Sequence, residues 1–196
     1  MAKVNESVST HDEIPPKWIR NAKDNLEEKL KDDDFRKILD FFVIFTPCKG
    51  TSARAKPLKE KYGWEDTYGL KESMRLAPSK QSIFLFAESG KEMKAVLVEA
   101  DLSDNFPSNF EYERGCFYQG SKKQLDSVFS HIRNCFAHGR FSIKEKDGDW
   151  TFIFEDVGKG RGFPKGTPSA RMILKKSTLL RWIEIIEGGE ASLAST

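Results

Sequence analysis

The sequence lacks the features of membrane-spanning, disulfide-rich and strongly basic proteins. Its three cysteines, Cys48, Cys116 and Cys135, are widely spaced with no Cys-x-x-Cys pair, which predicts neither a disulfide framework nor a zinc site. The longest apolar run, residues 41–45, is far shorter than the ~18 residues of a spanning helix. Lys and Arg number 32 against 30 Asp and Glu, so charge alone indicates no nucleic-acid or membrane partner.

Several sequence motifs of metal and nucleotide enzymes are also missing. The chain has no His-Glu-x-x-His, Gly-x-Ser-x-Gly or calcium-loop pattern, and the stretch GKGRG at 158–162 lacks the spacing and the Lys-Ser/Thr of a Walker loop. We therefore expect no metal and no cofactor. Residues 1–13 have no apolar run of the signal-peptide kind, and we expect a soluble, cytoplasmic protein.

The composition of the chain, with 38% hydrophobic residues, is that of a globular protein. We expect one domain over residues 15–188, with disordered tails at 1–14 and 189–196. Apolar residues at helical spacing predict four helices in addition to the one discussed below, at 17–31, 35–43, 65–77 and 177–188. A basic connection is expected at 48–64 and a loop at 101–119. Residues 82–100 suit either a hairpin around Ser89-Gly90-Lys91 or a helix.

The clearest predicted element is a helix over residues 122–138. Ser121 and Gln124 form a capping-box pattern at its start, and Gly139 suits a left-handed residue after its end. Its apolar stripe is Leu125, Val128, Phe129, Ile132 and Phe136. After this helix the apolar period changes to two. FSIKEK and WTFIFEDV, around Asp147-Gly148-Asp149, predict a hairpin, and 170–175 can supply a third strand.

At ~100° per residue, Arg133, Asn134 and His138 lie together on the side of this helix away from the apolar stripe. A solvated polar face is the simple explanation, and a histidine in the last turn also interacts favourably with the helix dipole. His131 lies near the edge of the same band, where a surface or supporting position is expected. Cys135 lies beside the stripe, which favours a buried, inert thiol.

The stretch RNCFAHG, residues 133–139, resembles the signature of the HEPN superfamily (higher eukaryote and prokaryote nucleotide-binding domains). That signature is an Arg, then a polar residue such as Asn, and a His near the end of an amphipathic helix. Here these residues are Arg133, Asn134 and His138. The basic hairpin and last helix also resemble a plasmid-borne bacterial branch of the family, whereas residues 46–120 are not accounted for by it.

The resemblance implies a fold and an activity. The implied fold class is α+β, mainly α: a HEPN-like helical bundle with a small antiparallel β-sheet following the motif helix. The implied function is that of a metal-independent endoribonuclease, in toxin–antitoxin systems or phage defence. His138 would be the general acid or base, Arg133 would hold the phosphate, and Asn134 would orient the histidine or bind the phosphate. The implied partners are a second copy of the chain, forming a composite active site, an RNA substrate and an antitoxin protein.

Basic residues near the motif are weaker candidates for RNA binding, because charged loops are usually just solvated. They are Lys122, Lys123, Arg140, Lys159, Arg161 and Lys165. Phe141 and Phe163 can stack on bases, although alternation with Ile143 favours a core position for Phe141. Two alternatives to the nuclease remain open: a non-catalytic RNA- or protein-binding module of the same fold, and a structural dimerisation protein.

Overall fold

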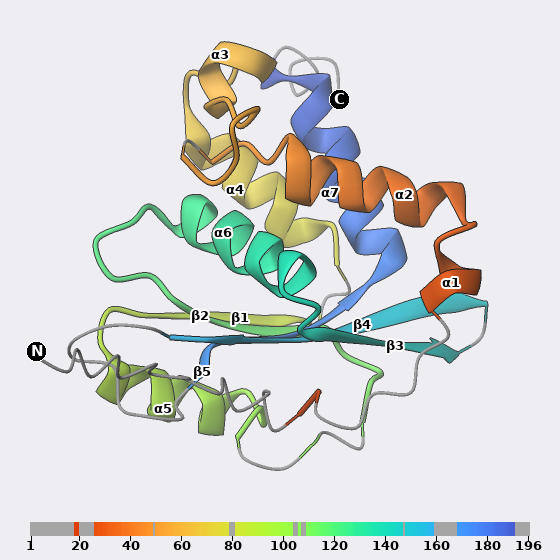
Figure 1. Cartoon of the computed structure of the whole chain (residues 1–196). Helices are drawn as coiled ribbons and strands as arrows, with labels where there is room; N and C mark the ends of the chain where they lie inside the picture. Colours follow the sequence, from red (N-terminus) through yellow and green to blue (C-terminus); the bar gives the residue numbers. More distant parts are fainter. Residues whose placement is uncertain are drawn as a thin grey trace, which may run out of the picture.

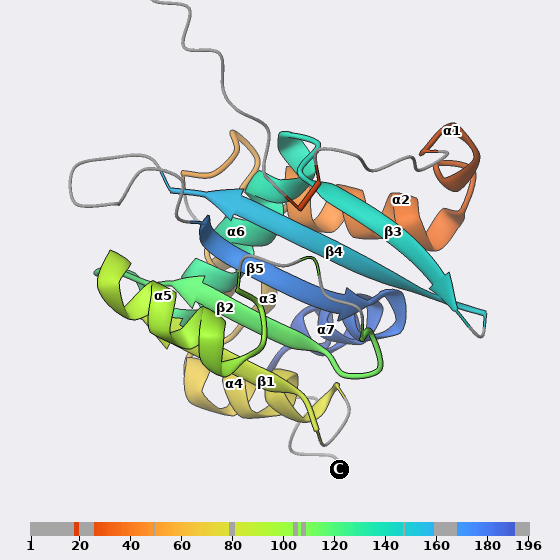
Figure 2. The same ribbon diagram turned by 90° about the horizontal axis from the view of Figure 1, so that it is seen from below.

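The computed structural model describes residues 18–19, 26–48, 50–78, 81–103, 106, 109–146, 148–158 and 168–190. Within these residues a five-stranded sheet runs through the middle of the molecule (Figure 1). The strand order is β1-β2-β5-β4-β3, and Figure 2 shows the strands side by side. The strands are β1 (Ile83–Ala87), β2 (Arg114–Tyr118), β3 (Phe141–Lys146), β4 (Asp149–Val157) and β5 (Pro168–Lys175).

Helices cover both faces of the sheet (Figure 1). On one face lies α5 (Gly90–Glu99), which connects the parallel strands β1 and β2, as a parallel pair requires a crossover. The opposite face carries α2 (Asp33–Leu39), the π-helical turn η1 (Asp40–Ile44), α3 (Leu58–Tyr62), α4 (Thr67–Leu76), α6 (Gln124–Ala137) and α7 (Lys176–Gly188). A single turn, α1 (Leu26–Lys29), precedes α2.

Each face of the sheet has its own apolar core. On the helix-rich face Phe35, Phe136, Phe141 and Phe152 form a group of ring contacts 5.1–6.3 Å apart. On the α5 face the smaller core is built from Met93, Leu97, Leu102, Cys116, Ile153 and Ile173. Strands covered on both faces lose the alternation of apolar and polar residues, which explains the nearly continuous burial of β4 and β5.

The end of α6 is set by a local backbone motif. Ala137 is the last residue of the helix, His138 is its C-cap, and Gly139 follows with φ +61°. The N–H of Arg140 donates to Cys135 O at 2.7 Å, and that of Gly139 donates to Phe136 O at 3.1 Å. These two bonds make a Schellman motif, which needs a left-handed residue at the glycine position. The expected helix and its terminal glycine are therefore confirmed.

The expected helical bundle is wrong. The strands after the motif helix do form, but β2 and the parallel β1 precede that helix and extend the sheet to five mixed strands. Residues 101–119, expected as a loop, contain β2, while 82–100 divide into β1 and α5. No described helix has the length and apolarity to cross a membrane. Residues 1–14 and 191–196 of the predicted tails, the turn residue Asp147, and residues 17 and 20–25 of the predicted 17–31 helix lie outside the described residues.

Candidate functional site around Asp156

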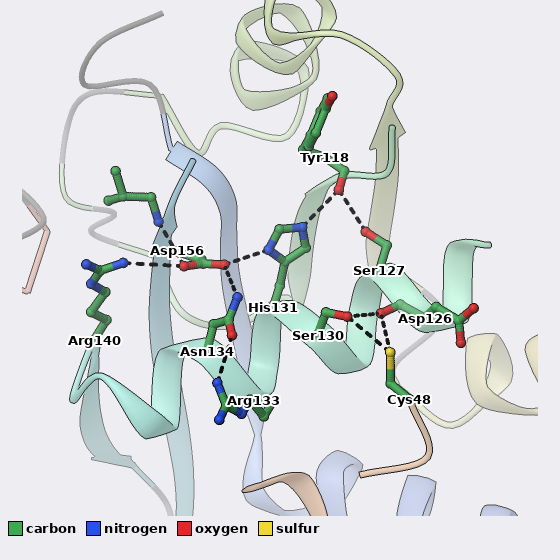
Figure 3. Close-up of polar contacts among 11 residues, drawn as sticks. Cys48, Tyr118, Asp126, Ser127, Ser130, His131, Arg133, Asn134, Arg140 and Asp156 are labelled. Atoms are coloured by element: carbon green, nitrogen blue, oxygen red, sulfur yellow. Dashed lines mark hydrogen bonds and ion pairs between the residues drawn. The ribbon is translucent and has the colours of Figure 1, made fainter. Parts of the chain in front are cut away.

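Asp156 near the end of β4 is the centre of the polar network at the motif helix (Figure 3). Its side chain is buried, with the residue 4% exposed. Oδ2 lies 2.8 Å from His131 Nδ1 and accepts from Asn134 Nδ2 at 3.1 Å. Oδ1 accepts from the Val157 N–H at 3.0 Å and, more weakly, from Arg140 Nη1 at 3.5 Å. The Asp156 carboxylate therefore links α6, and Arg140 just beyond its end, to the sheet.

His131 bridges β2 and β4 from its place on α6. The residue is 6% exposed, and its Nε2 lies 2.9 Å from the carbonyl oxygen of Tyr118. A carbonyl can only accept, and Asp156 is surrounded by donors. Both ring nitrogens therefore face oxygen atoms, one at the end of β2 and one on β4. Of the surface or supporting position expected for His131, the surface position is wrong: α6 lies over the sheet, and the side chain is buried against the end of β2 and Asp156 of β4.

The charge of Asp156 is set by opposing effects. Burial raises the pKa of its carboxyl group, but the hydrogen bond and charge of His131, the hydrogen bond of Asn134 and the charge of Arg140 together hold the pKa below its ordinary value. The carboxylate is thus ionised at neutral pH.

Arg133 is held at the outer end of this network. Its Nη1 donates to Asn134 Oδ1 at 3.3 Å, and Nε is buried without a hydrogen-bond partner. Within the described residues no carboxylate forms an ion pair with Arg133. The half-buried guanidinium thus keeps donors that neutral Asn134 does not satisfy. Such a group suits a phosphate oxygen.

His138 is exposed at the end of α6, one turn beyond Asn134. Its backbone N–H donates to Asn134 O at 3.0 Å, and its ring makes no hydrogen bond to the described residues. The motif residues therefore differ in their surroundings. Asn134 is fixed by Asp156, Arg133 is held by Asn134, and the His138 ring is available to an external molecule.

The basic candidates do not share one surface. Lys122 and Lys123 are exposed before the first turn of α6, so about 20 Å of helix separates them from His138. Arg140 is 7% exposed and faces Asp156, which makes it part of the network and not of a solvated surface. Lys159, Arg161 and Lys165, with Phe163, lie outside the described residues.

Other residues near the motif belong to the core. Phe141 begins β3 and is buried, as expected. Cys135 is fully buried, and burial, with the negative charge of Asp156, raises the pKa of its thiol well above the ordinary range. A thiol that stays protonated is a poor nucleophile, so Cys135 is structural.

Two grooves open on the described surface, of about 630 and about 480 Å³. The larger is lined by α4, β1, β2, α6 and α7, and the smaller by α2, η1, Lys61 and Glu187. Arg133, Asn134 and His138 line neither groove. Among the described residues no three His, Cys, Asp or Glu side chains are grouped so as to hold a metal ion.

Asp156 was not among the site residues predicted from the sequence, although the sequence around it indicates a buried carboxylate. Glu155 and Asp156 follow directly after the apolar run of β4, and acidic residues in a strand buried on both faces require partners. That signal predicts a paired carboxylate. It does not identify His131 as the partner, because only the packing of α6 on the sheet brings the two together.

Comparison of the chain with known proteins found no matching family model, no matching curated protein and no matching solved structure.

Proposed function

We propose that the protein is a metal-independent endoribonuclease in which Arg133 binds the scissile phosphate and His138 transfers the proton. The observation that carries this proposal is the state of Arg133: it is half-buried and oriented by Asn134, with no carboxylate partner among the described residues. The exposed ring of His138 lies at the end of the same helix. The likeness of RNCFAHG to the HEPN signature supports the same assignment.

The reaction needs only groups of these types. The ribose 2′-oxygen forms a bond to phosphorus while the bond from phosphorus to the 5′-oxygen breaks, leaving a 2′,3′-cyclic phosphate and a free 5′-hydroxyl. Neutral His138 takes the 2′-hydroxyl proton, and the guanidinium of Arg133 stabilises the charge that develops on the phosphate oxygens. A protonated His138 from a second copy of the chain supplies the proton for the 5′-oxygen, so the proposed enzyme is a homodimer.

The network specifies a role for Asn134. Its amide nitrogen donates to Asp156 and its oxygen accepts from Arg133, so both ends of the carboxamide are occupied. Asn134 therefore orients the guanidinium, and contact between its amide and the histidine ring is not needed. The residue pattern by itself allowed Asn134 either to orient the histidine or to bind the phosphate.

The test is RNA cleavage by purified protein in EDTA. We expect the wild type to leave 2′,3′-cyclic phosphate ends, and His138→Ala and Arg133→Ala each to lower the rate by about 10²-fold or more. His11→Ala and Arg181→Ala are matched controls elsewhere in the chain, and should retain wild-type activity. Circular dichroism must show that all four variants are folded. Equal activity in His138→Ala and the wild type contradicts the proposal.

Arg133 and Asn134 line neither of the two grooves described above, and a phosphate-binding guanidinium also suits a second candidate, an RNA-binding module that does not cut. In that case the wild type binds RNA without cleaving it, Arg133→Ala weakens binding, and His138→Ala has little effect. Filter binding alongside the cleavage assay separates the two functions. A toxin role under the first candidate further requires growth arrest on expression, relieved by a partner protein.

A further inference from the structure

We propose that the larger groove, between α4 and α6, is a binding site for a small amphipathic carboxylate, with an apolar chain in the groove and its acidic group at Lys71. This inference is independent of the ribonuclease proposal, because the groove contains none of the motif residues. Its volume of about 630 Å³ lies in the range of small-molecule sites, which run from roughly 300 to 1,000 Å³.

The floor of the groove is aromatic. Phe84 and Phe86 of β1 are only half-buried there, although both pack on neighbouring rings. Phe86 stacks on Phe117 at 5.4 Å between ring centroids, and Phe84 lies 6.0 Å from Trp182. Apolar rings left partly in water gain free energy when an apolar chain covers them.

The rim of the groove is also apolar on the α4 side. Leu76 lines the groove and is 70% exposed, which is among the highest exposures of the large hydrophobic residues in the described chain. Scattered apolar residues on a surface are ordinary. Leu76 is different because it continues an aromatic floor, and together they form one apolar surface of the kind that binds ligands.

Polar anchors of the groove define the chemistry of its occupant. Lys71 of α4 is half-buried and makes no hydrogen bond or ion pair with the described residues, whereas the neighbouring cation Arg75 is paired with Glu72 at 3.0 Å. An unpaired ammonium at an apolar groove complements a carboxylate. From the α6 side, Gln124 Oε1 is buried and has no hydrogen-bond partner. This oxygen only accepts hydrogen bonds, as a carboxylate does, so the anchor for the acidic group is Lys71.

The test uses decanoate and its neutral analogue 1-decanol as probes, titrated into the full-length protein and followed by calorimetry. We expect saturable binding of one decanoate per chain. Lys71→Glu should weaken decanoate binding by about five-fold or more and leave decanol binding nearly unchanged, because only the acid interacts with the ammonium. Lys94→Glu, an exposed lysine of α5 on the other face of the sheet, is the matched control.

A second pair of variants locates the apolar chain. Leu76→Gln should weaken the binding of both probes. Val98→Gln is the control and should weaken the binding of neither. Val98 lies on α5 and is 69% exposed, close to the 70% of Leu76. Absence of saturable decanoate binding overturns the proposal. If neither Lys71→Glu nor Leu76→Gln changes decanoate binding, the ligand lies elsewhere and the proposal is also overturned. Equal loss of decanoate and decanol binding in Lys71→Glu excludes the carboxylate anchor.

Discussion

Asp156 accepts hydrogen bonds from side chains on α6 and from the backbone of its own strand. The residue is deeply buried, and the pKa of its carboxyl group is nevertheless lowered. Burial alone penalises a carboxylate, and the favourable balance depends on His131, Asn134 and Arg140 being in place. Asn134 also orients Arg133, so stability and the proposed site share one carboxylate.

Asp156→Asn should lower the free energy of unfolding by about 3 kcal/mol, because it removes a buried carboxylate that faces His131 and accepts from Asn134 and Arg140. The pKa of Asp156 is lowered in the folded state. Its contribution is therefore full above the ordinary aspartate pKa of about 4, and is lost as pH falls through the folded value. Urea denaturation at pH 7 and at pH 3 should show a smaller acid loss in the variant than in the wild type.

Asp126 of α6 is the matched control for this measurement. Burial raises its pKa, although the charges of Lys123 and Lys122 oppose the change. A carboxyl group with a raised pKa destabilises the folded state when ionised, so Asp126→Asn should leave stability unchanged or slightly higher at pH 7. A larger loss for Asp126→Asn than for Asp156→Asn contradicts the assignment of Asp156 as the central carboxylate.

At the scale of elements, α6 has two distinct sides: an apolar side that packs into the core and a polar side that carries the motif. Leu125, Phe129 and Ile132 pack into the core, and Asn134 and His131 contact the sheet through Asp156 of β4. The capping box expected at its start is absent: the helix begins after Lys123, and no side chain caps it. Its end, in contrast, follows the local sequence, since the glycine after His138 permits the Schellman bonds.

Gly139→Ala should destabilise the protein by about 1 kcal/mol through backbone strain alone, because φ is +61° and an added Cβ meets no atom within 4 Å. Gly139→Asn should cost less, since asparagine tolerates the left-handed region. Chemical denaturation of the three proteins under one condition checks this order. Equal stability of the alanine variant and the wild type would show that the helix ends without the Schellman motif.

At the scale of the molecule, a buried ion pair joins distant parts of the chain on the α5 face. Glu155 of β4 and Arg171 of β5 are cross-strand neighbours, with Arg171 Nε 2.6 Å from Glu155 Oε2. The guanidinium also donates to Leu102 O at 3.0 Å and to Ser103 O, and lies 4.2 Å from the centre of the Trp18 ring. One cation therefore holds the segment after α5 and the residue Trp18 against the sheet.

Arg171→Leu should destabilise the protein by about 3–5 kcal/mol, because Glu155 is left buried and unpaired. The double substitution Glu155→Leu with Arg171→Leu should recover part of that loss, since it removes the uncompensated charge. Arg181→Leu, which breaks only the exposed pair with Glu184 on α7, should change stability by less than about 0.5 kcal/mol. Equilibrium unfolding measures these stabilities. A double variant no more stable than Arg171→Leu would contradict the role of unpaired Glu155.

Local sequence determined the elements whose signals lie within a few residues. The apolar stripe and terminal glycine predicted α6, and period two predicted β3 and β4. Local sequence also placed Arg133, Asn134 and His138 on one side of a helix. This part of the site follows from helical geometry alone.

Tertiary structure decided the sheet and the network. β2 contains Arg114 and Gly115 and follows a polar segment, and it is a strand because β1 and β5 pair with it on both sides. An added Cβ at Gly115 would lie 2.7 Å from the ring of Phe117 and 2.9 Å from that of Phe84, so the glycine is set by packing. The partnership of His131 with Asp156 arises in the same way. Contacts between residues far apart in the chain depend on the register and packing of whole elements, and a local pattern does not encode them.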